Sequence, residues 1–382
     1  MILNKLHRAL CALALATIPL ITPTLAHAAD FTTTEGYNAT CQSMPDTPNS
    51  LTNDDDRVAF VICHDTTLVR QIITWATRGF RRMEAEQPTE EAIIGEVYGE
   101  IDHVRTQLAI SRGVLEKIHL GHKKSLRLVP AQWQMDLNGD GKIDLWEQYL
   151  FAIPKRTDQQ FAVHMPSDKK EYYDTHYQLD AAIQVDQSDV LWALSYHDFI
   201  EGALTNLRAF GLVKNHEVVL KTPQLLTLAH QLIDQGLNNS DKLRRSVLAE
   251  TSNKEEWIGN PSQTDSVFPI ALEAKDFATW AVIVHEWSAV WQGRHLMPTS
   301  RPTDLLGSIA PCEEGTGLNL AQLYLHPPQD WTISLQQQVP LSSPHCQKID
   351  ARHPLSTVQT MIENARQSDP GMKFLRYLYW TN

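Results

Sequence analysis

Oxygen-bearing side chains alternate along one polar segment, residues 136–147, which reads Asp-Leu-Asn-Gly-Asp-Gly-Lys-Ile-Asp-Leu-Trp-Glu. A chain that winds around a cation presents every second residue inward, and here those residues are Asp136, Asn138 and Asp140. The glycine that follows at position 141 permits the positive φ of a sharp bend. Ca²⁺ accepts about six to eight oxygen ligands in a flexible geometry, whereas Mg²⁺ demands a tight octahedron. The segment therefore predicts a calcium site.

The same segment resembles the calcium loop of EF-hand proteins at each diagnostic position, and the resemblance covers about residues 130–152. It implies six metal ligands: Asp136, Asn138, Asp140, Lys142 through its backbone carbonyl, Asp144 directly or through water, and Glu147 with both carboxylate oxygens. The alternative is a polar turn that binds no metal.

Two departures from the EF-hand pattern bear on the role of this site. Pro130 leaves room for only a short entering helix, and no second loop accompanies the first. Ile143 therefore lacks the β partner through which paired hands associate. We expect a structural calcium site rather than a sensor, and pairing of two copies through Ile143 is the alternative.

The first 28 residues have the pattern of a secretory signal. Lys5 and Arg8 precede a short apolar run, and an Ala-x-Ala cleavage pattern ends at Ala28. A lipid anchor at Cys11 is the alternative, but the bulky Leu10 precedes that cysteine. We expect cleavage after Ala28 and a periplasmic or secreted protein.

Charge narrows the choice of partners. The chain of 382 residues has 33 Lys and Arg against 45 Asp and Glu, a net charge of −12. Removing residues 1–28 takes away two cations and no acids, which leaves −14. An acidic chain without a basic cluster argues against nucleic acid and suits cations. No later apolar run is long enough to span a membrane, so we expect calcium and an unidentified protein or small molecule as partners.

Four cysteines remain after cleavage, and an even number in an exported chain indicates disulfides. Three pairings are open, of which we favour the local pairs Cys41–Cys63 and Cys312–Cys346. Zinc is the alternative, although the chain has no Cys-x-x-Cys pair.

Apolar residues recur at helical spacing over most of the chain. The pattern predicts a mainly α fold, a multi-helix domain with the single EF-hand-like loop and a small β element near the C-terminus. The predicted helices cover residues 57–87, 89–115 (antiparallel to the first), 188–210, 222–237 with a continuation over 240–250, 272–292, and a short one from 356. The β element pairs residues 318–325 with 331–339.

The predicted organisation has four parts. They are a signal peptide over residues 1–28, a polar arm over 29–56, a helical domain with the loop over 57–292, and a loop-rich segment over 293–382, packed on the same domain.

The remaining candidates for chemistry are weaker. His197 and Glu201 stand one helical turn apart and could form a metal or proton-relay pair. His285, Glu286 and His295 lack the spacing of a metallopeptidase. A stripe of Trp280, Trp287 and Trp291 is typical of a packed core, although an aromatic binding platform has the same spacing.

Outside the loop, four segments resemble a group of exported bacterial proteins from which no activity transfers. They are Asp189-Val-Leu-Trp192, Glu256-Trp-Ile-Gly-Asn-Pro261, Gly317-Leu-Asn-Leu320 and residues 377–382. The leading hypothesis is an exported calcium-binding protein with one structural site, which serves as a binding or envelope-interaction module. The alternative is a calcium-stabilised periplasmic hydrolase with a cleft lined by His and Glu.

Overall fold

The computed structural model describes residues 29–156, 167–213, 217–301, 304, 306, 309–329, 331–333 and 340–368. Helices account for most of the secondary structure, as the sequence predicted. They are α2 (Thr34–Ser43), α3 (Asp54–Glu86), α4 (Glu90–Leu115), α5 (Leu145–Gln148), α6 (Lys170–His176), α7 (Gln187–Ala209), α8 (Pro223–Ala249), α9 (Ala274–Trp291), α10 (Leu320–Leu325) and α11 (Val358–Ser368).

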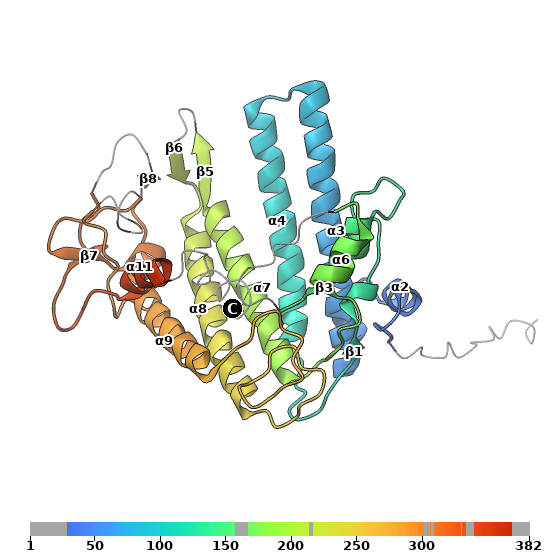
Figure 1. Cartoon of the computed structure of the whole chain (residues 1–382). Helices are drawn as coiled ribbons and strands as arrows, with labels where there is room; N and C mark the ends of the chain where they lie inside the picture. The colour runs from blue at the N-terminus through green and yellow to red at the C-terminus, as the bar shows by residue number, and fades with distance from the viewer. Residues whose placement is uncertain are drawn as a thin grey trace, which may run out of the picture.

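The long helices lie in a row in the order α3, α4, α7, α8 and α9 (Figure 1). The predicted antiparallel pair is confirmed: α3 and α4 form a hairpin whose tip extends beyond the elements packed around its base (Figure 1). Local side chains set the turn between them. Gln87 ends α3 in the left-handed region, with φ 45°, and the Thr89 side chain accepts a hydrogen bond from the Ala92 N–H at the start of α4.

Helix α8 is continuous, so the predicted break between residues 237 and 240 is wrong. Polar residues suggested that break, but their side chains hydrogen-bond to neighbouring helices. Asn239 Nδ2 donates to Asp198 Oδ2 on α7 (2.8 Å), and Ser240 Oγ accepts from Trp280 Nε1 on α9 (2.9 Å). Because these partners satisfy the polar groups, the helix continues through them.

Short strands pair the segments between helices. β1 (Arg127–Leu128) pairs with β4 (Ile183–Gln184), and β2 (Ile153–Pro154) with β3 (Tyr177–Gln178). β5 (Phe210–Val213), β6 (Glu217–Leu220) and β8 (Thr332–Ile333) form a three-stranded sheet, and β7 (Thr316–Leu318) pairs with β9 (Cys346–Lys348). All these pairs are antiparallel.

The predicted pairing of 318–325 with 331–339 is therefore wrong. Asn319 caps α10 by accepting a hydrogen bond from the Gln322 N–H, which turns most of the first segment into a helix. The described start of the second segment, β8, pairs with β6 instead. Residues 334–339 lie outside the described part of the chain.

Both predicted disulfides are present. Cys41–Cys63 joins α2 to α3, so the segment predicted as a polar arm carries a helix fixed to the bundle. Cys312–Cys346 joins the segment before β7 to β9. Two large apolar clusters form the core. One lies among α3, α4, α7 and the segments around β1 and β4 and reaches parts of α8 and α9. The other lies among the remaining parts of α8 and α9 and the C-terminal elements.

The predicted signal segment lies outside the described residues. No described helix combines the length and apolar character that a membrane span requires.

Candidate functional site

The predicted calcium loop forms a series of tight turns built on its own side chains. Asp136 Oδ1 accepts a hydrogen bond from the Gly139 N–H (2.7 Å), and Oδ2 accepts one from the Gly141 N–H (2.9 Å). Both glycines have positive φ, 72° and 87°, so each occupies a conformation that side-chain-bearing residues rarely adopt. The bend predicted at position 141 is present.

The next two candidate ligands repeat this arrangement. Asn138 Oδ1 accepts from the Asp140 N–H (2.8 Å), and Asp140 Oδ1 accepts from the Lys142 N–H (2.9 Å). Asp140 and Lys142 are exposed, as is Asp144. The Asp140 carboxylate thus lies at a solvent-accessible turn of the loop.

Glu147 is the exception, because its side chain is completely buried. Oε1 accepts from the Leu137 N–H (2.9 Å) and the Asn138 N–H (3.0 Å), and Oε2 accepts from the Asp144 N–H (2.8 Å). Three backbone donors thus orient the carboxylate from within the loop. A buried carboxylate loses its hydration, and a nearby cation offsets that cost.

The loop is fixed to α3 at its second residue. Leu137 is completely buried, and its carbonyl oxygen accepts a hydrogen bond from Thr74 Oγ1 (2.8 Å). Ile143 is 42 % exposed. The contact with α3 holds one side of the loop, and the opposite side faces solvent.

The flanking elements differ from the expected helices. A three-residue 3₁₀ helix, Pro130–Gln132, precedes the loop in place of the predicted short α-helix. The exiting helix α5 has four residues. The loop is therefore attached to irregular chain on both sides, with Trp133 before it and Phe151 after it, and those two rings lie 5.9 Å apart.

Outside the loop, one group of carboxyl groups lies closer together than the acidic groups of the loop do. One oxygen each from Asp186, Glu250 and Glu256 lie within 4.8 Å of one another. Within the described residues, no three acidic groups of the loop meet that distance. Binding an ion in the loop would therefore require its carboxylates to draw together.

A lysine already occupies the closer group. Lys124 Nζ lies 2.7 Å from Glu256 Oε2 and 3.0 Å from Asp186 Oδ2, and so places one positive charge among the acids. Burial and the Asp186 charge raise the pKa of Glu250 to about 7, and burial together with Asp186 holds the pKa of Asp189 well above its usual range. The cluster thus has more carboxyl groups than the lysine balances.

The predicted pairing of His197 with Glu201 is not formed. Glu201 Oε2 instead accepts from Arg112 Nε on α4 (2.8 Å). His197 Nε2 lies 3.1 Å from Asp65 Oδ2 on α3, and Nδ1 lies 2.7 Å from the Ala193 carbonyl oxygen. Burial lowers the pKa of His197, but the Asp65 carboxylate more than offsets this and the net pKa is raised. The buried His197 and the half-buried Asp65 thus join α7 to α3, and they form an ion pair when His197 is protonated.

The second group of histidines is also separated. Glu286 contacts His295 Nδ1 (3.0 Å) and accepts from the Thr357 N–H (2.8 Å), whereas His285 is exposed. Four cavities among the described residues have neither His197 nor His285 in their lining. Of the tryptophan stripe, Trp280 and Trp291 are buried in the core, and Trp287 lines an apolar groove between α7 and α9.

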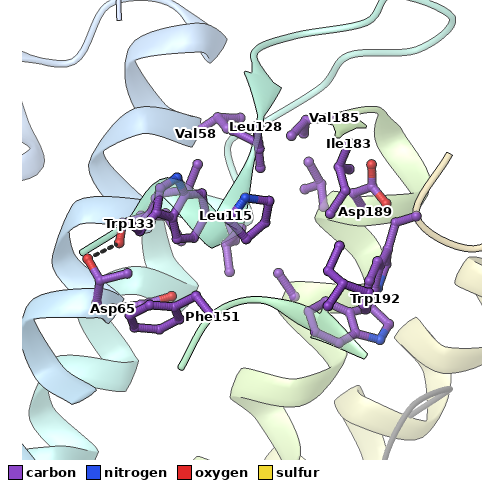
Figure 2. A pocket seen from close by; sticks show the side chains of 18 of the residues that line it. Val58, Asp65, Leu115, Leu128, Trp133, Phe151, Ile183, Val185, Asp189 and Trp192 are labelled. Atoms are coloured by element: carbon purple, nitrogen blue, oxygen red, sulfur yellow. Dashed lines mark hydrogen bonds between the residues drawn. The ribbon is translucent and has the colours of Figure 1, made fainter. Parts of the chain in front are cut away.

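A cavity of about 380 Å³ among α3, α4 and α7 was missed from the sequence (Figure 2). Its wall is mainly apolar and aromatic, with Asp65 and Asp189 labelled at opposite sides of it (Figure 2). The lining comes from segments spread between residues 58 and 257, so no contiguous motif could reveal it. The one signal was that Asp189, Trp192 and Trp257 fall in two segments singled out above.

Comparison with known proteins adds no relative: no family model, curated protein or solved structure matches the chain.

Proposed function

We propose that this protein is an exported calcium-binding protein in which one EF-hand-type loop, residues 136–147, serves a structural role. The observation that carries the proposal is the buried Glu147 carboxylate, which three backbone N–H groups orient beside a turn rich in oxygen ligands. The two disulfides suit an oxidising compartment outside the cytoplasm.

The donor set fits calcium. The side chains of Asp136, Asn138, Asp140, Asp144 and Glu147 offer oxygen ligands, and Lys142 adds a backbone carbonyl. The loop is already bent by Gly139 and Gly141, so little backbone reorganisation remains. A bound ion would supply the positive charge that offsets repulsion between the acidic side chains.

The position of the loop indicates what calcium would stabilise. Trp133 and Phe151, on either side of the loop, both line the cavity among α3, α4 and α7. Closing the loop around an ion would fix the spacing of these two rings. Calcium would therefore stabilise one wall of the cavity in a binding module.

Thermal unfolding of residues 29–382 in chelator and in millimolar Ca²⁺ tests this proposal. By linkage, Ca²⁺ at about 100 times its dissociation constant stabilises the folded protein by about 2.7 kcal/mol. We expect the melting temperature to rise by several degrees. Asp140→Asn should reduce that rise, because it removes one ligand charge while the amide oxygen still accepts from the Lys142 N–H.

Lys142→Ala is the matched control. It changes the adjacent exposed side chain but keeps the carbonyl, so the calcium-dependent rise should persist. Glu147 is not used for this purpose, because replacing it also disturbs three hydrogen bonds. Identical melting curves with and without Ca²⁺ in the wild type would overturn the proposal.

A further inference from the structure

The cavity among α3, α4 and α7 has the size and lining of a small-molecule site. Its volume of about 380 Å³ falls within the range of about 300–1,000 Å³ typical of ligand pockets. Aliphatic side chains form most of the wall. They come from both long helices of the hairpin, from α7 and from the β1–β4 pair. Such a lining favours a ligand with a largely apolar body.

The Asp65 side of the cavity already has its charge balanced. Asp65 lies beside His197 (3.1 Å) and accepts a hydrogen bond from Ser111 Oγ (2.5 Å). Burial raises the pKa of Asp65, but the His197 charge, the nearby His64 and the hydrogen bond from Ser111 hold it at about 2. The Asp65 carboxylate is ionised and already has a histidine partner, so this side of the cavity does not favour binding of a further cation.

The Asp189 side has an excess of acid. Asp189 Oδ2 accepts from the Asp186 N–H (3.0 Å), and Glu250 and Glu256 belong to the same cluster. Lys124 provides the positive charge among these four carboxyl groups, and it contacts Asp186 and Glu256. The carboxyl groups at this side outnumber the lysine, so one more cation would be electrostatically favourable here.

Aromatic rings stand at the same side. Trp192 and Trp257 line the cavity, and their ring centroids lie 5.6 Å apart in an edge-to-face arrangement. Tryptophan faces attract alkylammonium groups through their quadrupole, most strongly where water is excluded. An acid and two tryptophans in an apolar cavity form a combination suited to an organic cation.

We propose that the cavity binds an amphiphilic organic cation, with its ammonium group beside Asp189, Trp192 and Trp257. The apolar body of the ligand extends along the aliphatic wall toward Trp133 and Phe151. Binding would replace the missing positive charge and so favour the ionised form of the Asp189 carboxyl group. This site does not depend on calcium in the loop, because its acidic side is built by α7 and residues 250–257.

Isothermal titration with octyltrimethylammonium tests the proposal, with 1-octanol and octanoate as probes of the same chain length and different charge. The protein is the disulfide-bonded residues 29–382 in calcium. We expect the cation to bind about tenfold more tightly than the alcohol, and octanoate to bind more weakly than either. Binding of the cation should also release protons. The observed binding enthalpy should therefore change with the ionisation enthalpy of the buffer.

Asp189→Asn distinguishes the contribution of the carboxylate charge to binding from the contribution of the apolar cavity. Asparagine keeps an oxygen for the Asp186 N–H, so the fold is retained and octanol binding should not change. The preference for the cation and the proton release should both be lost. Asp180→Asn, a neutralisation of an exposed acid outside the cavity, should behave as the wild type does.

A filling variant, Ala193→Trp, tests the location, because Ala193 lines the cavity. It should abolish binding of both the cation and the alcohol while the circular dichroism spectrum stays unchanged. Equal affinity for octanol and octyltrimethylammonium in the wild type, tighter binding of octanoate, or no binding of any probe would each overturn the proposal.

Discussion

Individual carboxyl groups in this protein differ mainly in how their charge is matched. Asp65 has a histidine partner and one hydroxyl donor, so its pKa falls to about 2. Glu250 accepts a hydrogen bond from Ser188 Oγ but lies among other acids, and burial followed by the Asp186 charge raises its pKa to about 7. The two side chains should therefore influence stability in different pH ranges.

Glu250 should make the folded protein less stable as pH rises from about 4.5 to about 7. Its pKa is raised on folding, so the folded state binds the proton more tightly than the unfolded state, and raising the pH removes that advantage. Glu250→Gln should give a shallower decline of the unfolding free energy across this range. Urea unfolding of both proteins at pH 5, 6, 7 and 8 measures the difference.

Burial also raises the pKa of Asp198 to about 6 and the pKa of Asp189 well above its usual range, so both groups add a decline of the same sign. The difference between the two slopes therefore gives the contribution of Glu250 together with its charge interaction with Asp189. Equal slopes in the wild type and Glu250→Gln would contradict the assignment.

Among the described elements, α7 and α8 have the most extensive contact with one another. A Cβ atom at Gly236 of α8 would lie 2.7 Å from the Phe199 ring of α7, and one at Gly202 of α7 would lie 2.8 Å from Ile233. Glycine is normally unfavourable within a helix. Here the two glycines allow the helix axes to approach.

Gly236→Ala should therefore destabilise the protein although alanine is the better helix former. We expect a loss of about 1–3 kcal/mol from overpacking against Phe199. Gly99→Ala in α4 is the matched control, because nothing lies within 4 Å of the added methyl group. The control should stabilise by about 0.5–1 kcal/mol, and urea unfolding of both variants measures the contrast.

Sequence patterns located helices better than strands. The ends of α3, α4 and α9 follow local signals such as the Thr89 cap and Gly293, so they could be predicted. The segment 318–325 could not, because Leu318 and Leu320 are both buried, one in a strand and one in a helix. Burial alone does not distinguish the two conformations.

The candidate sites also differ in whether their residues are contiguous in the sequence. The loop at 136–147 is contiguous, so the spacing of its candidate ligands and its bend at Gly141 are visible in the sequence. The cavity is lined by both Asp65 and Asp189, 124 positions apart in the sequence, through the packing of α3 and its neighbours. Only tertiary structure reveals which distant carboxyl groups line one cavity.

At the scale of the whole molecule, the two disulfides stabilise opposite ends of the helix row. Their separations are 22 and 34 residues. The loop-entropy relation gives about 3 kcal/mol for the first and about 4 kcal/mol for the second. Removing either pair should therefore lower the free energy of unfolding substantially.

Cys41→Ser with Cys63→Ser, and Cys312→Ser with Cys346→Ser, measure these contributions separately. Urea unfolding of each double variant should show a loss close to these values. A loss near zero for Cys41–Cys63 would mean that α2 stays packed on α3 without the covalent bond.

The order of the cysteines along the chain has a further consequence. Each bond joins consecutive cysteines, so the loops they close neither overlap nor nest. A chain that enters an oxidising compartment from its N-terminus presents Cys41 and Cys63 before either later cysteine arrives. The native pairing is thus the one that directional entry forms first, and the protein should reach it without disulfide isomerisation.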